Sequence, residues 1–210
     1  MPNPRPLALG CTYHVYNRGT NGETLFRTER NCRYFLERYT HYIEPVAITY
    51  AYCLMKNHFH LAIRTRTEEE QVAYHTAAGK ASPFRLLSPS RRLSHLFNAY
   101  ARAYNRDVGR TGSLFEHPFR RKLVQDESYL WHLIVYIHRN PEHHGFNEDF
   151  REWPFSSYRA HLSRKPTHLA RDWVVAGLGG RQEFAASHDA DSSDQIQAWM
   201  IEVEDVEDTD

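Results

Sequence analysis

The chain has 210 residues, of which 41% are hydrophobic, and a formal net charge of zero, which suits one polar-surfaced domain that buries a core. No run approaches the roughly 20 apolar residues of a transmembrane helix, and residues 1–10 lack the apolar segment of a signal peptide. We therefore expect a cytoplasmic protein with no membrane partner. Three widely spaced cysteines form no Cys-x-x-Cys pair, so nothing indicates a disulfide framework or a zinc knuckle.

The zero net charge conceals an uneven distribution along the chain. From Arg181 onward there are one basic and ten acidic residues, so the part before it carries an excess of about nine positive charges. A basic body that is rich in histidine and aromatic residues suits a polyanion such as nucleic acid, and the acidic tail would moderate non-specific binding. An ordinary solvated surface explains the same composition equally well.

The first third of the chain predicts the element order βαββ. Alternating aromatic and β-branched residues indicate a strand before a glycine-containing turn, and apolar positions at helical spacing follow. Two further runs then form strands joined by the short turn at Lys56 and Asn57. The expected elements are the strand 11–18, the helix 31–43, and the strands 47–55 and 58–65.

The following segment is harder to interpret. Between residues 66 and 90 the apolar pattern fades, which favours a basic loop or a short irregular helix. Ser90 can cap a helix that ends near Gly109, and residues 113–124 predict a strand whose Pro118 suggests an edge or a bulge. A further helix begins at Asp126 and runs to about Arg139.

Asn140 and Pro141 are expected to stop that last helix, because the residue before a proline disfavours the helical conformation. Residues 153–159 predict a loop that leads into a short helix. Beyond a glycine cluster the chain becomes rich in serine and acidic residues, with helical segments expected around Phe184 and at 196–201 and disorder at 202–210. We therefore divide the chain into a domain at 1–165 and an acidic, partly disordered extension at 166–210.

Two histidines lie on the strand that begins at His58. Side chains on a strand alternate between its faces, so His58, His60 and Arg64 share one side while the apolar residues between them share the other. The apolar side can pack on a core. The opposite side offers two imidazoles one pleat apart, with a guanidinium further along, which together could hold a metal ion and an anion.

The helix that starts near Asp126 has two distinct stripes. Its apolar positions would pack on the sheet: Tyr129, Leu130, Leu133, Ile134 and Ile137. On a neighbouring stripe, His132, Tyr136 and Asn140 follow one another at a spacing of four residues. A tyrosine hydroxyl can attack phosphorus once it loses its proton, but an ordinary pKa near 10 requires a base, a metal ion or a cationic setting.

The His58-Phe59-His60 run resembles the histidine-hydrophobic-histidine motif of the HUH endonucleases. Four further blocks, in this order, resemble the REP-associated tyrosine transposases, a single-tyrosine family whose members are similar to insertion-sequence transposases. These blocks are YHVYNRG from Tyr13, NRDVGRTGSLFEHPFRRKLV from Asn105, YIHRNPEHHGF from Tyr136 and WPFSSYR from Trp153. The resemblance spans residues 13–162.

The resemblance implies a ferredoxin-like α+β fold: an antiparallel sheet with helices on one face and the HUH histidines on the other, followed by the acidic C-terminal extension. It implies a metal-dependent enzyme that cleaves and rejoins single-stranded DNA beside palindromic REP hairpins through a 5′-phosphotyrosine intermediate. Tyr136 would be the nucleophile, and His58, His60 and Asn140 would bind the metal. The expected cofactor is Mg²⁺ or Mn²⁺; two imidazoles favour Mn²⁺, and Zn²⁺ competes on ligand softness.

Several cations are candidates for contact with DNA phosphate, although each could equally belong to a solvated surface. His132 could assist the tyrosine or merely border the site. Tyr129, which would mimic the second tyrosine of two-tyrosine relatives, is expected to lie in the core. The candidate DNA-binding residues are Arg18, Arg64, Arg106, Arg110, Arg120, Arg121 and Lys122.

Two alternatives to an active transposase-like enzyme remain open at this stage. The first is a non-catalytic protein that descends from a transposase and binds structured nucleic acid. The second is a histidine phosphoesterase acting on RNA ends, which needs two His-x-Thr or His-x-Ser motifs that this sequence lacks. For the enzyme, a monomer that assembles its site within one chain is favoured over a dimer.

Overall fold

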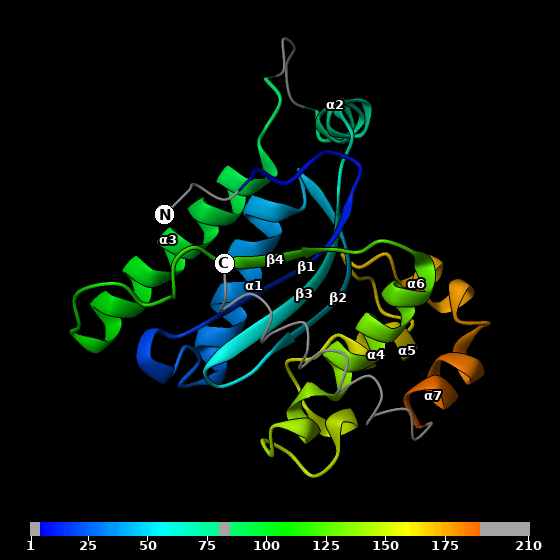
Figure 1. The fold of residues 1–210 in the computed structure, drawn as a ribbon. Helices are drawn as coiled ribbons and strands as arrows, with labels where there is room; N and C mark the ends of the chain where they lie inside the picture. Colours follow the sequence, from blue (N-terminus) through cyan, green and yellow to red (C-terminus); the bar gives the residue numbers. More distant parts are fainter. Residues whose placement is uncertain (1–4, 80–84, 190–210) are drawn as a thin grey trace.

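The computed structural model describes residues 5–79 and 85–189 (Figure 1). In this part of the chain the strands form a four-stranded antiparallel sheet in the order β2-β3-β1-β4. With two helices on one face this is the ferredoxin-like α+β fold that the resemblance implies, and the prediction is confirmed. The strands are β1 (Thr12–Arg18), β2 (Ala47–Leu54), β3 (His58–Thr65) and β4 (Arg120–Leu123).

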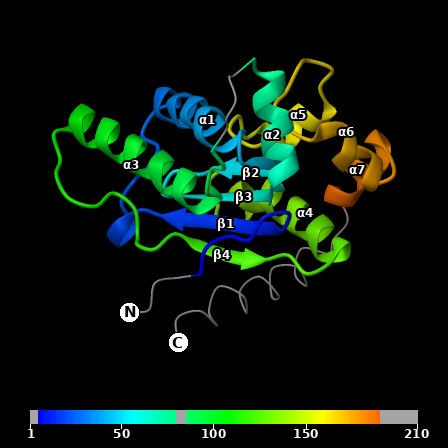
Figure 2. The ribbon, with the colours of Figure 1, turned by 90° about the horizontal axis from the view of Figure 1, so that it is seen from above.

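Helices cover both faces of the sheet (Figure 2). On one face lie α1 (Glu29–Ile43) and α3 (Pro89–Val108), which pack on the apolar side of β3 through Phe59, Leu61 and Ile63. On the other face, α4 (Glu127–His143) crosses β2 and β3. The alternation of side chains along β3 therefore assigns its apolar residues to the first layer and its histidines to the second.

Shorter helices complete the described residues. They are η1 (Thr20–Gly22), α2 (Glu68–Ala77), η2 (Phe150–Glu152), α5 (Tyr158–Leu162), α6 (Arg171–Gly177) and α7 (Arg181–Asp189). None of the helices in the described ranges combines the length and the apolarity that a membrane span needs.

Helix α2 lies where the sequence leaves open a loop or a short irregular helix. It begins with a capping box in which the Thr67 hydroxyl accepts from the Glu70 backbone amide and the Glu70 carboxylate accepts from the Thr67 amide. Only Gln71 is buried in this helix, so it has no apolar stripe for a periodicity argument to detect. The capping signal was present, but apolar spacing alone could not reveal it.

Two other boundaries also differ from those expected. The strand predicted for residues 113–124 is shorter, because only Arg120–Leu123 pairs with β1, while Leu114 and Phe115 pack in the core from a loop. Helix α3 is capped by Ser88 rather than Ser90, and it ends as expected where Gly109 adopts a left-handed conformation with φ of 66°.

The prediction that Asn140 and Pro141 stop the tyrosine helix is wrong. Helix α4 continues through Pro141 to His143. A proline removes one backbone hydrogen bond, yet Pro141 is buried and the last turn is closed by the His144 amide, which donates to the Asn140 carbonyl at 3.0 Å. Tertiary packing thus overrides the local preference, and Asn140 stays in the helix, one turn beyond Tyr136.

Helices α6 and α7, which belong to the expected extension, pack against α4. Val174 and Phe184 are fully buried beside Leu133 and Ile137. His188 on α7 donates to or accepts from His138 on α4, with 2.8 Å between His188 Nε2 and His138 Nδ1. The division of the chain at residue 165 stays a prediction, and the segments expected at 196–201 and 202–210 lie outside the described residues.

The opposite edge of His138 contacts the Ser157 hydroxyl, with 2.7 Å from Nε2 to Oγ. The same hydroxyl accepts from the Tyr52 backbone amide of β2 at 2.9 Å. Because His138, Ser157 and His188 are all fully buried, the cluster joins α7, α4 and the sheet structurally, and its serine is inaccessible to a substrate.

The buried position of His188 predicts that stability falls in acid. Burial lowers its pKa from 6.5 to about 4, with neighbouring positive groups adding to the effect and a bond to the Phe184 carbonyl opposing it. The neutral His188 ring contributes its full stabilisation of the fold above pH 6.5. This contribution is lost as the pH falls towards 4, at about 1.4 kcal/mol of unfolding free energy per pH unit. Urea unfolding between pH 7.5 and 4.5 should show this loss.

The matched variant is His188→Phe, which keeps an aromatic ring but cannot titrate. At pH 7.5 it should lose roughly 1–3 kcal/mol because His138 Nδ1 loses its partner. Its stability should nevertheless fall less steeply below pH 6.5 than that of the wild type. Equal slopes for the two proteins would contradict the assignment.

Candidate functional site

The two histidines of β3 face α4, as the strand alternation predicts. Their ring centroids lie 5.3 Å apart. His60 is 3% exposed, whereas His58 lies closer to the end of the strand and is partly exposed. The His58 Nδ1 atom is 2.8 Å from the Asn57 side-chain oxygen. This hydrogen bond fixes the orientation of the His58 ring and involves only Nδ1, so Nε2 is left for another contact.

Helix α4 brings Tyr136 to the same place. The Tyr136 ring stands edge-on to His60 with 5.5 Å between centroids, and the tyrosine is 5% exposed. One turn later, the Asn140 side-chain amide donates to the Tyr136 carbonyl at 3.0 Å, which leaves its oxygen Oδ1 free to accept. His60 and Tyr136, which are 136 − 60 = 76 positions apart in sequence, therefore converge, because the apolar stripe of α4 packs on β2 and β3.

The polar atoms at this junction suit a divalent cation. His58 Nε2 and Asn140 Oδ1 are both buried, and neither is in hydrogen-bonding geometry with another atom of the described residues, although the Asn140 side chain lies close enough to raise the His58 pKa. Burying a polar atom without a partner costs roughly 1–3 kcal/mol, so two such atoms in one place point to a ligand. The described residues contain no group of three His, Cys, Asp or Glu side chains that could hold a metal, so a cation bound here would need a further ligand of another kind, such as the Asn140 amide oxygen.

The protonation state of the histidines also fits. Burial lowers the pKa of His58 to about 3, His144 and Arg18 add to this effect, and the neighbouring Asn140 side chain opposes it. Burial, together with His14, His58 and His144, holds the pKa of His60 well below its usual value. Both rings are neutral at pH 7, and neutral imidazole is the form that binds a metal. Two imidazoles with an amide oxygen and no thiolate are compatible with Mn²⁺, and Zn²⁺ still competes because imidazole also suits it.

Two residues of the site were not singled out from the sequence. His14 and Tyr16 lie on β1 and share the face of His58 and His60. His14 is fully buried and 2.8 Å separates its Nε2 from His60 Nδ1, while Tyr16 stacks on His60 with 5.6 Å between centroids. The alternation argument that was applied to β3 would have found both if it had been applied to YHVYNRG.

The end of α4 adds two more histidines to this region. His144 lies edge-on to His58 with 4.6 Å between ring centroids, and His143 lies 6.3 Å from the ring of Tyr136. The sequence alone assigns neither histidine a role.

The candidate cations separate by face. Arg120 and Lys122 of β4 pair with Tyr16 and His14 in register, so they share the histidine face, as does Arg18 at the end of β1. Arg121 lies opposite Val15, whose side chain packs in the core between the sheet and helices α1 and α3, on the face away from the histidines. The three consecutive cations of β4 therefore do not form one surface, because adjacent residues of a strand point to opposite sides.

Several of these cationic side chains form ion pairs with acidic residues. Glu116 lies 2.6 Å from Arg18 and 3.9 Å from Arg120. Arg64 shares the histidine face, but it lies at the far end of β3, where it pairs with Glu70 at 2.5 Å. Arg110 is 2.9 Å from the Asn105 side-chain oxygen and 3.7 Å from Glu23.

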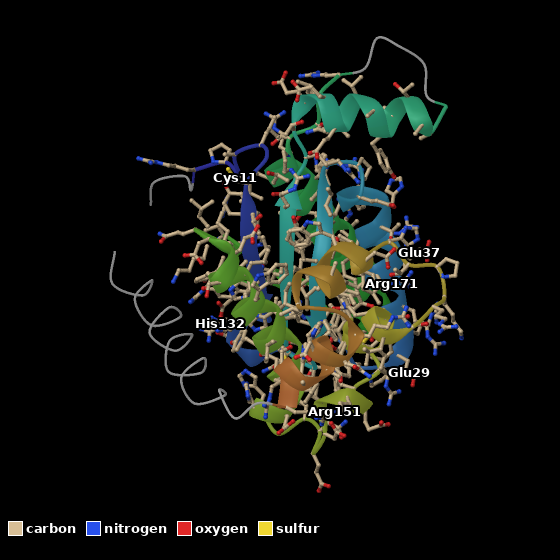
Figure 3. All side chains as sticks on the ribbon, turned by 90° about the vertical axis from the view of Figure 1, so that its right-hand side faces the viewer. Cys11, Glu29, Glu37, His132, Arg151 and Arg171 are labelled. Atoms are coloured by element: carbon tan, nitrogen blue, oxygen red, sulfur yellow. The ribbon has the colours of Figure 1, made fainter. Side chains whose placement is uncertain are left out.

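Arg106 and His132 lie away from the junction. Arg106 is exposed in the last turn of α3 and lines a pocket of about 350 Å³ between α1 and α3, on the face opposite the histidines. His132 is exposed on α4, one turn before Tyr136. In Figure 3 it lies at the left edge of the molecule, whereas Arg151 lies at the bottom and Arg171 on the right. The structure places neither side chain against Tyr136 or the histidine pair.

A ferredoxin-like sheet with a histidine pair under a tyrosine-bearing helix is the arrangement that the motifs led us to expect, and comparison with known proteins agrees. The chain is 29% identical over 125 residues to a Haemophilus influenzae protein that is provisionally named a REP-associated tyrosine transposase. The alignment covers 60% of this chain and 65% of the relative, which is slightly under two thirds of the relative's length. No protein family model matches.

A solved structure described as a REP-associated tyrosine transposase bound to a REP hairpin has a similar fold. The TM-score is 0.57 at 16% sequence identity, with 79% of this chain and 88% of the other covered. At this identity the likeness shows the fold. The resemblance inferred from the motifs is thus confirmed: this chain resembles the REP-associated tyrosine transposases in sequence and in architecture.

The geometry predicts that the protein binds Mn²⁺ in the absence of DNA. Replacing His58 with alanine removes one ligand and should weaken binding by more than the roughly 10–100-fold typical of a lost supporting residue. Isothermal titration calorimetry would measure the affinity. His95→Ala, an exposed histidine of α3 on the opposite face, should bind Mn²⁺ as the wild type does; an equal loss in both variants would argue against this site.

Proposed function

We propose that this protein is a metal-dependent enzyme that cleaves and rejoins single-stranded DNA beside palindromic hairpins through a 5′-phosphotyrosine. The observation that carries the proposal is the approach of Tyr136 to His60 within one chain, at 5.5 Å between ring centroids, with Asn140 one helical turn away. The motif resemblance and the named relatives support it. Fold likeness alone would not, because similar folds host many functions.

Each residue has a separate role in the proposed reaction. His58, His60 and Asn140 hold a divalent cation, Mg²⁺ or Mn²⁺, which when bound polarises a phosphoryl oxygen and orients the phosphate. Tyr136 Oη forms a bond to phosphorus, the bond from phosphorus to the 3′ oxygen breaks, and the tyrosine proton ends on the released 3′-hydroxyl. Rejoining reverses these steps with an incoming 3′-hydroxyl, so no nucleotide cofactor is needed.

Cations beside α4 supply the contact with DNA backbone. Arg18, Arg120 and Lys122 lie on β1 and β4, on the same face as the histidines and next to the strands that α4 covers. Their phosphate contacts would orient the DNA without reading its sequence. A hairpin of the REP type is the proposed partner, since the relative of similar fold is described as bound to one.

The proposed enzyme works as a monomer. Tyr136, His60 and Asn140 meet in a single chain, so no second copy has to supply the tyrosine. A dimer would be required only if the tyrosine helix exchanged between two chains.

Replacing Tyr136 with phenylalanine should abolish the covalent protein–DNA adduct while leaving hairpin affinity nearly unchanged, because only the nucleophilic oxygen is lost. The assay incubates protein, Mn²⁺ and a hairpin-bearing single strand, and separates denaturation-resistant adducts by gel electrophoresis. Tyr42→Phe, on the opposite face beside Arg92, is the matched control and should retain the adduct.

Tyr16 provides the competing outcome, since its ring lies 5.6 Å from that of His60. If the adduct persists in Tyr136→Phe and disappears in Tyr16→Phe, the nucleophile is the strand tyrosine. Mass spectrometry of the tryptic DNA-linked peptide would identify the residue directly.

The face assignment of the β4 cations predicts unequal effects on DNA binding. Replacing Arg120 and Lys122 together with alanine should weaken hairpin binding and reduce the slope of log affinity against log salt by about one per lost phosphate contact. Arg121→Ala should change the slope little, because its side chain lies on the opposite face. Fluorescence anisotropy at several salt concentrations tests this, and a larger effect from Arg121 would place the DNA on the α1–α3 side.

One observation favours the alternative of a non-catalytic protein that binds structured nucleic acid. Tyr136 is only 5% exposed, so a phosphate can reach it only if neighbouring groups move. Such a protein would bind the hairpin in the same salt-dependent way but would form no adduct with Mn²⁺ or Mg²⁺. The adduct assay therefore separates the two functions.

A further inference from the structure

We infer that His14 is a positioning residue that accepts a hydrogen bond from His60 Nδ1 and so leaves His60 Nε2 bare for the metal ion. This inference rests on the proposed metal site but concerns a residue that neither the motif comparison nor the relatives assign. His14 would not touch the metal or the DNA. It would act only through His60.

The fold fixes His14 beside His60. The two residues lie on adjacent antiparallel strands, where His14 pairs with Ala62 and Tyr16 pairs with His60. Nitrogen atoms of the two rings are 2.8 Å apart, and His14 is fully buried. Tyr16 stacks on both rings, with centroids 4.6 Å from His14 and 5.6 Å from His60. Neither imidazole can turn away without disturbing this stack.

The chemistry of imidazole gives this contact a consequence for metal binding. A neutral ring has one protonated and one bare nitrogen, and the hydrogen bond at one nitrogen decides which form is present. If His60 donates from Nδ1 to His14, its Nε2 carries a lone pair that can bind a cation. If the proton lies on Nε2, that lone pair is absent. Metal-binding histidines ordinarily have such an acceptor at the second nitrogen.

His14 is fully buried, which disfavours a charged ring, and the neutral ring keeps one bare nitrogen that can accept a hydrogen bond. As an acceptor at Nε2, His14 carries its own proton on Nδ1, an atom that is buried and has no hydrogen-bond partner among the described residues. A buried N–H without a hydrogen-bond partner destabilises the fold, and such a group is expected where the residue serves ligand binding rather than stability.

The test compares two substitutions of His14 in the full chain without DNA. Phenylalanine fills the space but cannot accept a hydrogen bond, so His14→Phe should weaken Mn²⁺ binding by roughly 10–100-fold. Glutamine offers an amide oxygen, so His14→Gln should recover much of the affinity. Calorimetry gives the affinities, and circular dichroism melting verifies that each variant folds.

A spectroscopic readout separates positioning from packing. In Mg²⁺-loaded wild type, the ¹⁵N shifts of His60 should report a proton on Nδ1, and His14→Gln should retain this signature. If His14 serves only for packing, the folded His14→Phe variant binds Mn²⁺ with wild-type affinity; that result overturns the inference. A wild-type His60 protonated on Nε2 in the loaded protein overturns it as well.

The adduct assay keeps this inference distinct from the proposed function. A wild type that forms the adduct, together with His14→Phe that binds Mn²⁺ normally, refutes the role of His14 alone. A wild type that forms no adduct although His14→Phe weakens Mn²⁺ binding refutes DNA cleavage and supports the role of His14.

Discussion

The docking of α4 on the histidine side of the sheet is the contact on which the rest of the site depends. Strand β3 presents its apolar residues to α1 and α3, so its other face could have remained polar and solvated. Instead, the apolar stripe of α4, including Leu133 and Ile137, buries that face. Apolar burial stabilises the contact by roughly 25 cal/mol per Å², and the same contact brings Tyr136 to His60.

This burial also explains why the site is chemically unusual. His14, His60 and Asn140 are removed from water, and burial disfavours the charged form of each imidazole. A stable core would place apolar residues at these positions, since unpaired buried polar groups weaken a fold. Their clustering under one helix therefore adds little stability, which is supplied elsewhere, notably by Phe35, Phe59 and Tyr100 between the sheet and α1 and α3.

Sequence reasoning succeeded where one physical rule acted alone and failed where tertiary contacts changed the outcome. The two-residue period placed His58 and His60 on one face because a regular strand permits no other arrangement. The segment that holds α2 stayed open between a loop and a short irregular helix, because α2 buries almost no apolar surface. The proline rule wrongly ended α4 before Asn140, since packing of Pro141 supports the last turn. The same two-residue period, unused for Arg120, Arg121 and Lys122, would have separated their faces.

The sequence by itself determined most of the element types, the face of each β3 residue and the motifs that indicate a tyrosine transposase-like protein. These follow from local periodicity and residue chemistry, which act over a few positions. Only the tertiary structure decided that Tyr136 meets His60, that His14 lies 2.8 Å from that histidine, and that Arg121 lies on the other side of the sheet. Such contacts join residues tens of positions apart, and their energies come from packing between layers, which no local pattern encodes.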